Sequence, residues 1–159
     1  MTKPIRAVML LCCLVGSSAA FAEGDNPPDE RGLAKLKRFM EICSTNDDLD
    51  AAAKLVVAEK LVHASKLDKN DPSKMNSDSM RFAFKKAHQG ARLYDPTPKV
   101  TRYLLTGVSA VGFGPTAQKG KVYKYFVAKK EGVNGMPAPI NIFYPDDGSE
   151  PVVYDFGSF

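Results

Sequence analysis

Apolar residues in the first half of the chain recur at steps of three and four, which is the period of a helix with one buried face. The first stripe predicts a helix from about Asp29 to Cys43. It consists of Leu33, Leu36, Met40 and Cys43. A second helix is expected from a cap at Asn46 or Asp47 to about Leu67. Its candidate buried residues are Leu49, Ala52, Leu55, Val56, Leu61 and Val62. The short connection predicts that these two helices pack as an antiparallel hairpin.

A third helix is expected after a charged loop that contains a proline. Ser77 or Asp78 provides its cap, and the helix should stop within Gly90–Asp95. Its apolar face carries Met80, Phe84, Ala87 and Ala91. We expect Phe84 to anchor this helix to a sheet, because only that face is apolar enough to cover one. His88 extends the same stripe, so it should lie at the edge of the core with one ring nitrogen hydrogen-bonded.

From residue 99 onward, β-branched and aromatic residues predominate, and turn signals separate them. Strands are expected over residues 99–111, 121–129, 140–144 and 152–156. Gly107, in the middle of the first strand, predicts a bulge or a close approach of a helix. The glycine-rich segment Gly112–Lys121 superficially suggests a phosphate loop, but Val122 stands where such a loop needs Ser or Thr, and a strand follows. We therefore interpret it as a hairpin connection.

Helices followed by strands, rather than alternating with them, indicate an α+β fold. The connections between the strands have lengths that suit an antiparallel meander. The sequence thus predicts three N-terminal helices packed on one face of a curved four-stranded antiparallel sheet.

The first 22 residues have a different pattern. Lys3 and Arg6 precede an apolar run over Ala7–Gly16, and small residues at Ala20 and Ala22 suit a signal peptidase. This predicts a secretory signal peptide over residues 1–22, cleaved after Ala22, and a single α+β domain over residues 23–159. We expect a periplasmic or secreted protein. No membrane anchor is expected, because the two cysteines inside the apolar run lack the small residue that precedes a lipidated cysteine.

With this signal peptide and with NDDLDAA at the helical hairpin turn and PVVYDFG at the end of the meander, the chain resembles small exported proteins of the NTF2-like (cystatin-like) superfamily. The resemblance covers about residues 29–157 and is one of architecture. It implies a cone-shaped sheet that wraps a helix and leaves a pocket. Some members use such a pocket for catalysis, and many use it only for binding or assembly, so the fold does not decide the function.

Removal of the signal peptide lowers the formal net charge from +4 to +2, because Lys3 and Arg6 leave with it. So weak a balance argues against a protein that follows nucleic-acid phosphates. Of the three cysteines only Cys43 remains, which excludes an intramolecular disulfide framework. We interpret Cys43 as a buried small hydrophobic residue; the alternatives are an intermolecular disulfide or a reactive thiol.

Few residues are arranged for chemistry. The only two histidines, His63 and His88, lack the ligand spacing of a metal site, so neither a metal nor another cofactor is expected. The better candidate is one face of the sheet. Period-two alternation would place Ile140, Ile142, Tyr144, Val152, Tyr154 and Phe156 on one side, with Asn141, Phe143, Val153 and Asp155 opposite. The candidate binding residues are Tyr123, Tyr125, Asn141, Phe143 and Asp155. The alternative is that this face is simply solvated.

A second interpretation concerns four tyrosines that stand among lysines in the strands, namely Tyr103, Tyr123, Tyr125 and Tyr144. A basic aromatic surface of this kind binds polyanions or a protein partner, although such lysines also protect sheet edges from aggregation. We expect an exported, non-enzymatic binding module, accessory or inhibitor-like, with a protein, glycan or envelope polyanion as partner. The alternative is a small pocket enzyme of isomerase or hydrolase type that uses Asp155 as base and a tyrosine as donor.

Overall fold

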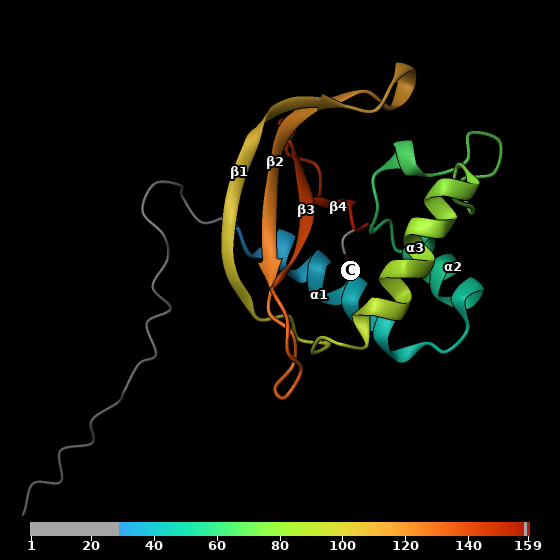
Figure 1. Ribbon diagram of the computed structural model, residues 1–159. Helices are drawn as coiled ribbons and strands as arrows, with labels where there is room; N and C mark the ends of the chain where they lie inside the picture. The colour runs from blue at the N-terminus through green and yellow to red at the C-terminus, as the bar shows by residue number, and fades with distance from the viewer. Residues whose placement is uncertain (1–28, 158) are drawn as a thin grey trace, which may run out of the picture.

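The computed structural model describes residues 29–157 and 159; the signal peptide expected over residues 1–22 lies outside this part of the chain. Within the described residues, three helices precede four strands (Figure 1). The helices are α1 (Glu30–Thr45), α2 (Leu49–Ala58) and α3 (Asp78–Ala91), and the strands are β1 (Val100–Val111), β2 (Gln118–Val127), β3 (Ala138–Pro145) and β4 (Val152–Asp155). The strands form one antiparallel sheet in the order β1-β2-β3-β4. The α+β class and the meander are therefore confirmed.

Each helix begins at a side chain that accepts a hydrogen bond from a free backbone N–H group. Asp29 caps α1, accepting from the N–H of Arg31, and Ser77 caps α3 as expected from the sequence. The cap of α2 is Asp48 rather than Asn46 or Asp47. Asn46 instead ends α1, where its backbone and side-chain nitrogens both donate to the carbonyl of Ile42.

The expectation that the second helix continues to about Leu67 is wrong, because α2 ends at Ala58. Lys60 adopts a left-handed conformation with φ 51°, and the N–H groups of Lys60 and Leu61 return to the carbonyls of Val57 and Val56. This is a Schellman C-cap, which reverses the chain direction. The next residues, 61–63, are extended, and the backbone of His63 donates to the carbonyl of Val153 at the edge of β4.

Burial in this region follows from that change of direction. Leu61 and Val62 are buried as expected, but in an extended segment beside β4 and not on a helix face. Leu55, expected to be buried, is 38% exposed. A 3-10 turn, η1 (Ala64–Lys66), follows the extended segment and leads to the loop before α3.

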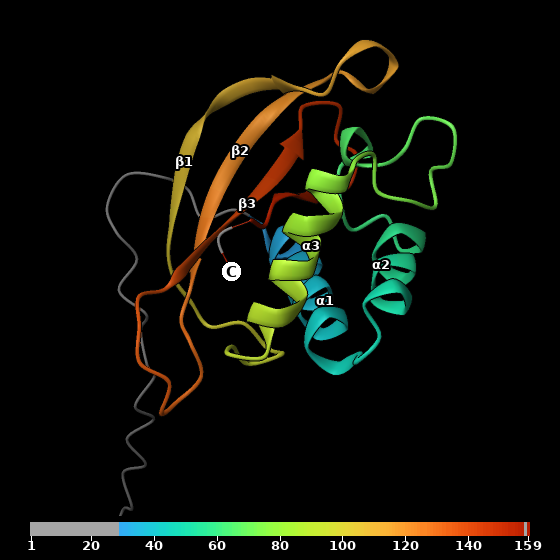
Figure 2. The same cartoon turned by 45° about the vertical axis from the view of Figure 1, so that its right-hand side comes forward.

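The main core lies between α1 and the face of the sheet formed by alternate residues of β2 and β3. Helix α1 contacts β3 and β4, whereas α2 and α3 pack on α1 and on each other (Figures 1 and 2). Phe84 is fully buried, as expected, and its ring meets Phe39 of α1 and Phe156 just after β4, with centroids 6.2 and 6.1 Å away. Helix α3 therefore packs on α1 and reaches the sheet at the end of β4.

The sheet has three register shifts, at Val100/Arg102, Leu105/Gly107 and Asn141/Ile142, and the last two decide which of the site residues share a face. In β1 the register shifts between Leu105 and Gly107, where Gly107 has φ 142°, a conformation that disfavours any side chain. The bulge expected at Gly107 is confirmed. In β4, Ile142 pairs with Val153 but Asn141 pairs with Asp155, so Tyr154 is an extra residue.

The extra residue in β4 corrects the expected alternation of that strand. Val153 faces the main core beside Ile142, whereas Val152 and Tyr154 pack with Phe143 on the opposite side. The expectation had placed Val152 and Tyr154 on the same face as Ile142, and Val153 on the same face as Phe143. Asn141 and Asp155 are neighbours all the same, because the bulge restores their common face.

Candidate functional site

The five candidate residues from the sequence do not gather at one place. Tyr123 and Tyr125 of β2 pair with Ile142 and Ile140, which face the main core. Asn141, Phe143 and Asp155 point to the opposite side, since alternate residues of a strand face opposite ways. A pocket in which Asp155 is the base and Tyr123 or Tyr125 the donor is therefore not formed, and each face is described separately below.

The core-facing side of the sheet brings four tyrosines together, and we call Tyr103, Tyr123, Tyr125 and Tyr144 the tyrosine face. Tyr103 pairs with Tyr125 across β1 and β2, with ring centroids 6.4 Å apart. The rings of Tyr123 and Tyr144 meet edge to face at 5.3 Å. Tyr125 is only 3% exposed, whereas the other three are partly exposed. Three strands thus contribute to one aromatic surface.

The hydroxyl groups of Tyr125 and Tyr144 form a hydrogen-bonded chain that reaches Asp29, the N-cap of α1. The Tyr125 and Tyr144 hydroxyl oxygens are 2.6 Å apart, and Tyr144 lies 3.4 Å from the carbonyl oxygen of Asp29. A carbonyl only accepts, so Tyr144 donates to Asp29 and its oxygen accepts from Tyr125. Burial raises the pKa of Tyr144 to about 12 and that of Tyr125 higher still, so both hydroxyls stay protonated donors at neutral pH.

The start of α1 fits against these tyrosines because residue 32 is glycine. A Cβ atom at Gly32 would overlap the hydroxyl group of Tyr144 and would lie 3.2 Å from that of Tyr125. The glycine therefore lets the first turn of the helix approach the sheet closely, although glycine lowers helix propensity.

Two lysines border the tyrosine face, and a third marks the other side of the same strand. Lys121 pairs with Tyr144, and Lys119 has the same parity along β2 as Tyr123 and Tyr125. Both are exposed, and neither forms an ion pair with any of the described residues. Lys124 pairs with Asn141 and therefore lies on the opposite side of the sheet.

On that opposite side, the predicted neighbours Asn141 and Asp155 are in contact. The Asn141 Nδ2 group donates to Asp155 at 3.4 Å, and the other carboxylate oxygen accepts from the Gly157 backbone at 3.1 Å. Asp155 is exposed. Phe143 is fully buried in a small apolar cluster with Val111 and Val122. This outer cluster also includes Val152 and Tyr154 at its margin.

His63 covers the outer cluster, which sequence reasoning missed. It is 2% exposed, and its ring meets Phe143 and Tyr154 edge to face with centroids 5.4 and 5.9 Å away. Its Nδ1 atom lies 2.8 Å from the hydroxyl oxygen and 3.2 Å from the backbone nitrogen of Ser65, and its Nε2 atom lies 3.1 Å from Oε1 of Gln118. The sequence signal was weak, because His63 stood in the segment expected to be helical and Gln118 is far away along the chain.

Lys66 completes this side. Its ammonium group lies 4.4 Å from the centre of the Tyr154 ring, and burial lowers its pKa although nearby Asp155 opposes that effect. A cation over an aromatic ring is an attractive contact, so Lys66 helps to hold η1 against β4.

The two remaining candidates from the sequence, His88 and Cys43, are both buried in the fold. His88 is buried, and its Nε2 atom lies 2.6 Å from the carbonyl oxygen of Asn46, which confirms the expected single hydrogen bond at the core edge. Cys43 is buried and unpaired, also as expected, and burial raises the pKa of its thiol to about 12. A thiol that is protonated and shielded in this way is a poor nucleophile.

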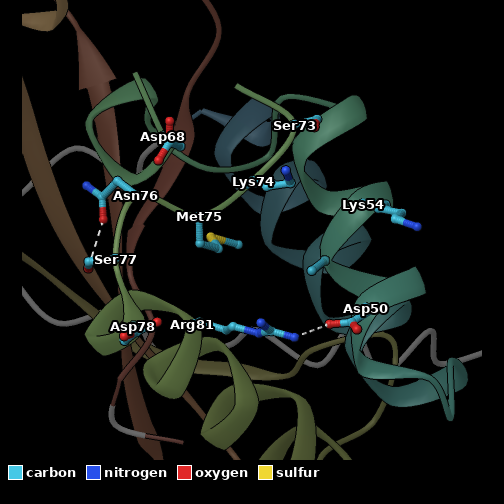
Figure 3. A pocket seen from close by; sticks show the side chains of 11 residues that line it. Asp50, Lys54, Asp68, Ser73, Lys74, Met75, Asn76, Ser77, Asp78 and Arg81 are labelled. Atoms are coloured by element: carbon cyan, nitrogen blue, oxygen red, sulfur yellow. Dashed lines mark hydrogen bonds and ion pairs between the residues drawn. The ribbon is translucent and has the colours of Figure 1, made fainter. Parts of the chain in front are cut away.

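A groove of about 750 Å³ lies between α2, the loop before α3 and the first turn of α3 (Figure 3). Its charged side chains have both signs, and Arg81 bridges it to Asp50 at 2.8 Å. Met75 provides an apolar wall, and Ser77 bonds to Asn76 within the loop. The charged lining residues are three acidic and three basic side chains, so the groove favours no particular ligand charge.

Three further findings concern the whole described region. Among residues 29–157 and 159, no three side chains of His, Cys, Asp or Glu gather as metal ligands would. None of the helices in this region has the length and apolar character needed to cross a membrane. No protein-family model matches the chain, and neither curated proteins nor solved structures give a match.

Proposed function

We propose that this chain is an exported, non-enzymatic binding protein that holds a protein partner against its tyrosine face. The observation that carries the proposal is the convergence of partly exposed tyrosines from three strands on one side of the sheet. Tyrosine supplies a large, rigid contact area with a polar tip, and it is enriched among residues that dominate binding energy. Export is proposed on the pattern of residues 1–22 alone.

The lysines indicate the chemistry of the partner. Lys119 and Lys121 project from the same side of β2 as Tyr123 and make no ion pair with the described residues. Acidic side chains on a partner would meet two uncompensated positive charges beside an aromatic surface. The proposed partner therefore presents carboxylates next to an apolar or aromatic contact. A polyanionic glycan would use the lysines but would gain less from the ring edges.

We also propose that the fold is an NTF2-like cone. Two features support this: α1 packs inside the curve of the sheet, and residues 61–63 pair with β4 immediately before α3. Many members of the superfamily have an additional strand before their third helix, and this extended segment occupies the corresponding place in the chain order. In this arrangement the tyrosine face corresponds to the inner, pocket-forming side.

Charge reversal on the two sides of β2 tests the binding proposal. Lys121→Glu changes the tyrosine face, and Lys124→Glu makes the same change on the opposite side, so the pair is matched in strand, residue type and charge. The unmodified chain is used to capture partners from extracts of the producing cells, and captured proteins are identified by mass spectrometry and purified. The purified partner is then titrated with the unmodified chain and with each variant. We expect Lys121→Glu to weaken binding of the captured partner at least about tenfold and Lys124→Glu to leave it within about twofold.

Two results would contradict the proposal. Equal loss of binding in the two variants would show that net charge, and not the tyrosine face, holds the partner. Retention by heparin-like polyanions with no protein bound would assign the lysines to a glycan instead. Circular dichroism of both variants checks that neither the substitution at the exposed Lys121 nor that at the half-buried Lys124 unfolds the chain.

A further inference from the structure

The hydroxyl group of Ser65 lies at hydrogen-bonding distance from a buried histidine. Its Oγ atom is 2.8 Å from Nδ1 of His63, and the other ring nitrogen, Nε2, is 3.1 Å from Oε1 of Gln118. The Gln118 amide continues the series, because its Nε2 atom lies 3.4 Å from a carboxylate oxygen of Asp147. A hydroxyl, an imidazole and an acceptor that orients the imidazole form, in this order, the arrangement that activates serine nucleophiles.

Groups that can only donate or only accept set the direction of every bond in this series. The Asp147 carboxylate only accepts, so the Gln118 amide donates to it and turns its oxygen toward the ring of His63. The backbone N–H group of Ser65, 3.2 Å from Nδ1, only donates. His63 therefore carries its proton on Nε2, and the lone pair of Nδ1 faces the Ser65 hydroxyl. That hydroxyl donates to a nitrogen that can take its proton.

The imidazole base is held in place away from solvent. His63 is 2% exposed, and the edge-to-face contacts of its ring with Phe143 and Tyr154 fix its orientation. Burial lowers the pKa of His63, and nearby Lys66 lowers it further, although the Gln118 acceptor opposes these effects in part. The ring is therefore unprotonated at neutral pH, which is the state that a base requires.

Ser65 is half-buried and lines a second groove, of about 430 Å³. This groove lies between η1, the loop before α3 and the tip of the β1–β2 hairpin, which reaches toward η1 (Figures 1 and 2). Asn76 holds the loop against η1, because its side-chain amide donates to the carbonyl of Ser65 and its backbone N–H donates to that of Lys66. Leu67 and Phe113 supply apolar lining, and Phe113 is 87% exposed. An apolar group bound here would gain free energy by covering that ring.

We propose that Ser65 is an activated nucleophile, with His63 as its base, and that it accepts an acyl group from a short-chain ester bound in this groove. Ser65 Oγ bonds to the acyl carbon, and the bond from that carbon to the leaving oxygen breaks. His63 Nδ1 takes the hydroxyl proton and passes it to the leaving oxygen, so the products are acylated Ser65 and a free alcohol. A single transfer is sufficient, so the site is compatible with a non-enzymatic binding protein. It does not depend on the tyrosine face.

The chain contains a matched control for each of the two residues. Ser77 lines the same groove, but its hydroxyl contacts Asn76 and Ser79 rather than a histidine. His88 is also buried, but its Nε2 atom contacts the carbonyl of Asn46 rather than a hydroxyl. Ser77 tests whether a place at the groove is enough for reactivity, and His88 tests whether loss of any buried histidine has the same effect.

A fluorophosphonate ester measures the reactivity of Ser65, because it forms a stable bond with activated serines. The serine oxygen displaces fluoride from phosphorus, and His63 takes the hydroxyl proton. Intact mass and peptide mapping locate the adduct. We expect one adduct in the folded chain, on Ser65 and not on Ser77, and none in urea. Ser65→Ala should abolish labelling. His63→Asn, which retains a capping acceptor but no base, should slow it at least about 100-fold, whereas His88→Gln should leave the rate unchanged.

p-Nitrophenyl acetate then tests the acyl class. The folded chain should release p-nitrophenolate, measured by absorbance, and prior labelling of Ser65 by the fluorophosphonate should prevent that release. A labelled Ser65 with no transfer from this ester would overturn the assignment of an acyl ester.

Three results would overturn the nucleophile itself: no fluorophosphonate adduct in the folded chain, an adduct on Ser77 as readily as on Ser65, or an equal labelling rate in His63→Asn. Circular dichroism checks that each variant folds. If His63→Asn does not fold, the comparison of the unmodified chain with and without urea decides. Equal labelling of Ser65 in the two conditions would then show that the folded arrangement does not activate it.

Discussion

Replacement of Gly32 by alanine tests how the first turn of α1 meets the sheet. In an exposed helix interior, this change usually adds about 1 kcal/mol of stability, because alanine has the higher helix propensity. Here the new methyl group would overlap the Tyr144 hydroxyl, which the Tyr125 hydroxyl holds in place at 2.6 Å. The overlap costs about 1–3 kcal/mol as overpacking, and displacement of Tyr144 loses a hydrogen bond worth about 1 kcal/mol. We therefore expect net destabilisation of about 1–3 kcal/mol.

The measurement is urea unfolding followed by circular dichroism, which suits a chain that has no tryptophan. A double-mutant cycle isolates the contact, because Tyr144→Ala removes the side chain that the methyl group meets. In that background Gly32→Ala should be neutral or stabilising by up to about 1 kcal/mol, giving a coupling energy of about 1–4 kcal/mol. If Gly32→Ala stabilises the unmodified chain, α1 does not rest on Tyr144, and the hydroxyl chain is misplaced.

Two further predictions concern the core. Phe84→Ala should destabilise by about 3–5 kcal/mol because its ring fills the space between Phe39 and Phe156, whereas Phe82→Ala, two residues away on α3 and 61% exposed, should cost less than about 1 kcal/mol; equal denaturant midpoints would place Phe84 at the surface. Cys43 should resist a thiol reagent at pH 8 in the native state and react at once in denaturant, because burial raises its pKa to about 12; rapid native labelling, followed by absorbance, would contradict its burial.

Sequence periodicity was sufficient to predict the helices and strands whose local conformational preference agrees with their tertiary packing. The stripe from Leu36 to Cys43 and the cap at Ser77 specify α1 and α3 without reference to distant residues, and both helices form within two residues of their expected bounds. The strands were also predictable, because their β-branched residues are separated by turn residues.

Residues 61–67 were mispredicted because their environment is set by a distant strand. Leu61 and Val62 continue the helical spacing of α2, so periodicity alone extends the helix through them. The competing interaction is backbone pairing with Val153, which lies in the last strand. The turn that permits this pairing uses Lys60 at positive φ, where a glycine would have signalled a helix end. His63 could therefore not be assigned to the outer side of the sheet from sequence.

The candidate site was divided because the register between β2 and β3, which the sequence does not specify, pairs Tyr123 with Ile142 and Tyr125 with Ile140. Bulges in the two outer strands change the facing of further residues. In β1, Tyr103 and Val111 have the same parity, yet Tyr103 lies on the tyrosine face and Val111 lies in the outer cluster. Thr106 is an extra residue in the bulge before Gly107, and it places Tyr103 and Val111 on opposite faces of the sheet. In β4, Tyr154 does the same for Val153 and Asp155.

These two bulges explain how one small sheet presents different chemistry on its two sides. Without the bulge in β1, Val111 would lie on the tyrosine face, and Phe143 would lose an apolar neighbour beneath His63. Without the bulge in β4, Val153 and Asp155 would share a side, so either a carboxylate would enter the core or an apolar residue would leave it. Each alternative exposes apolar surface or buries charge. The cost of exposing apolar surface or burying charge therefore fixes the register and also keeps the tyrosine face and the outer cluster on opposite sides of the sheet.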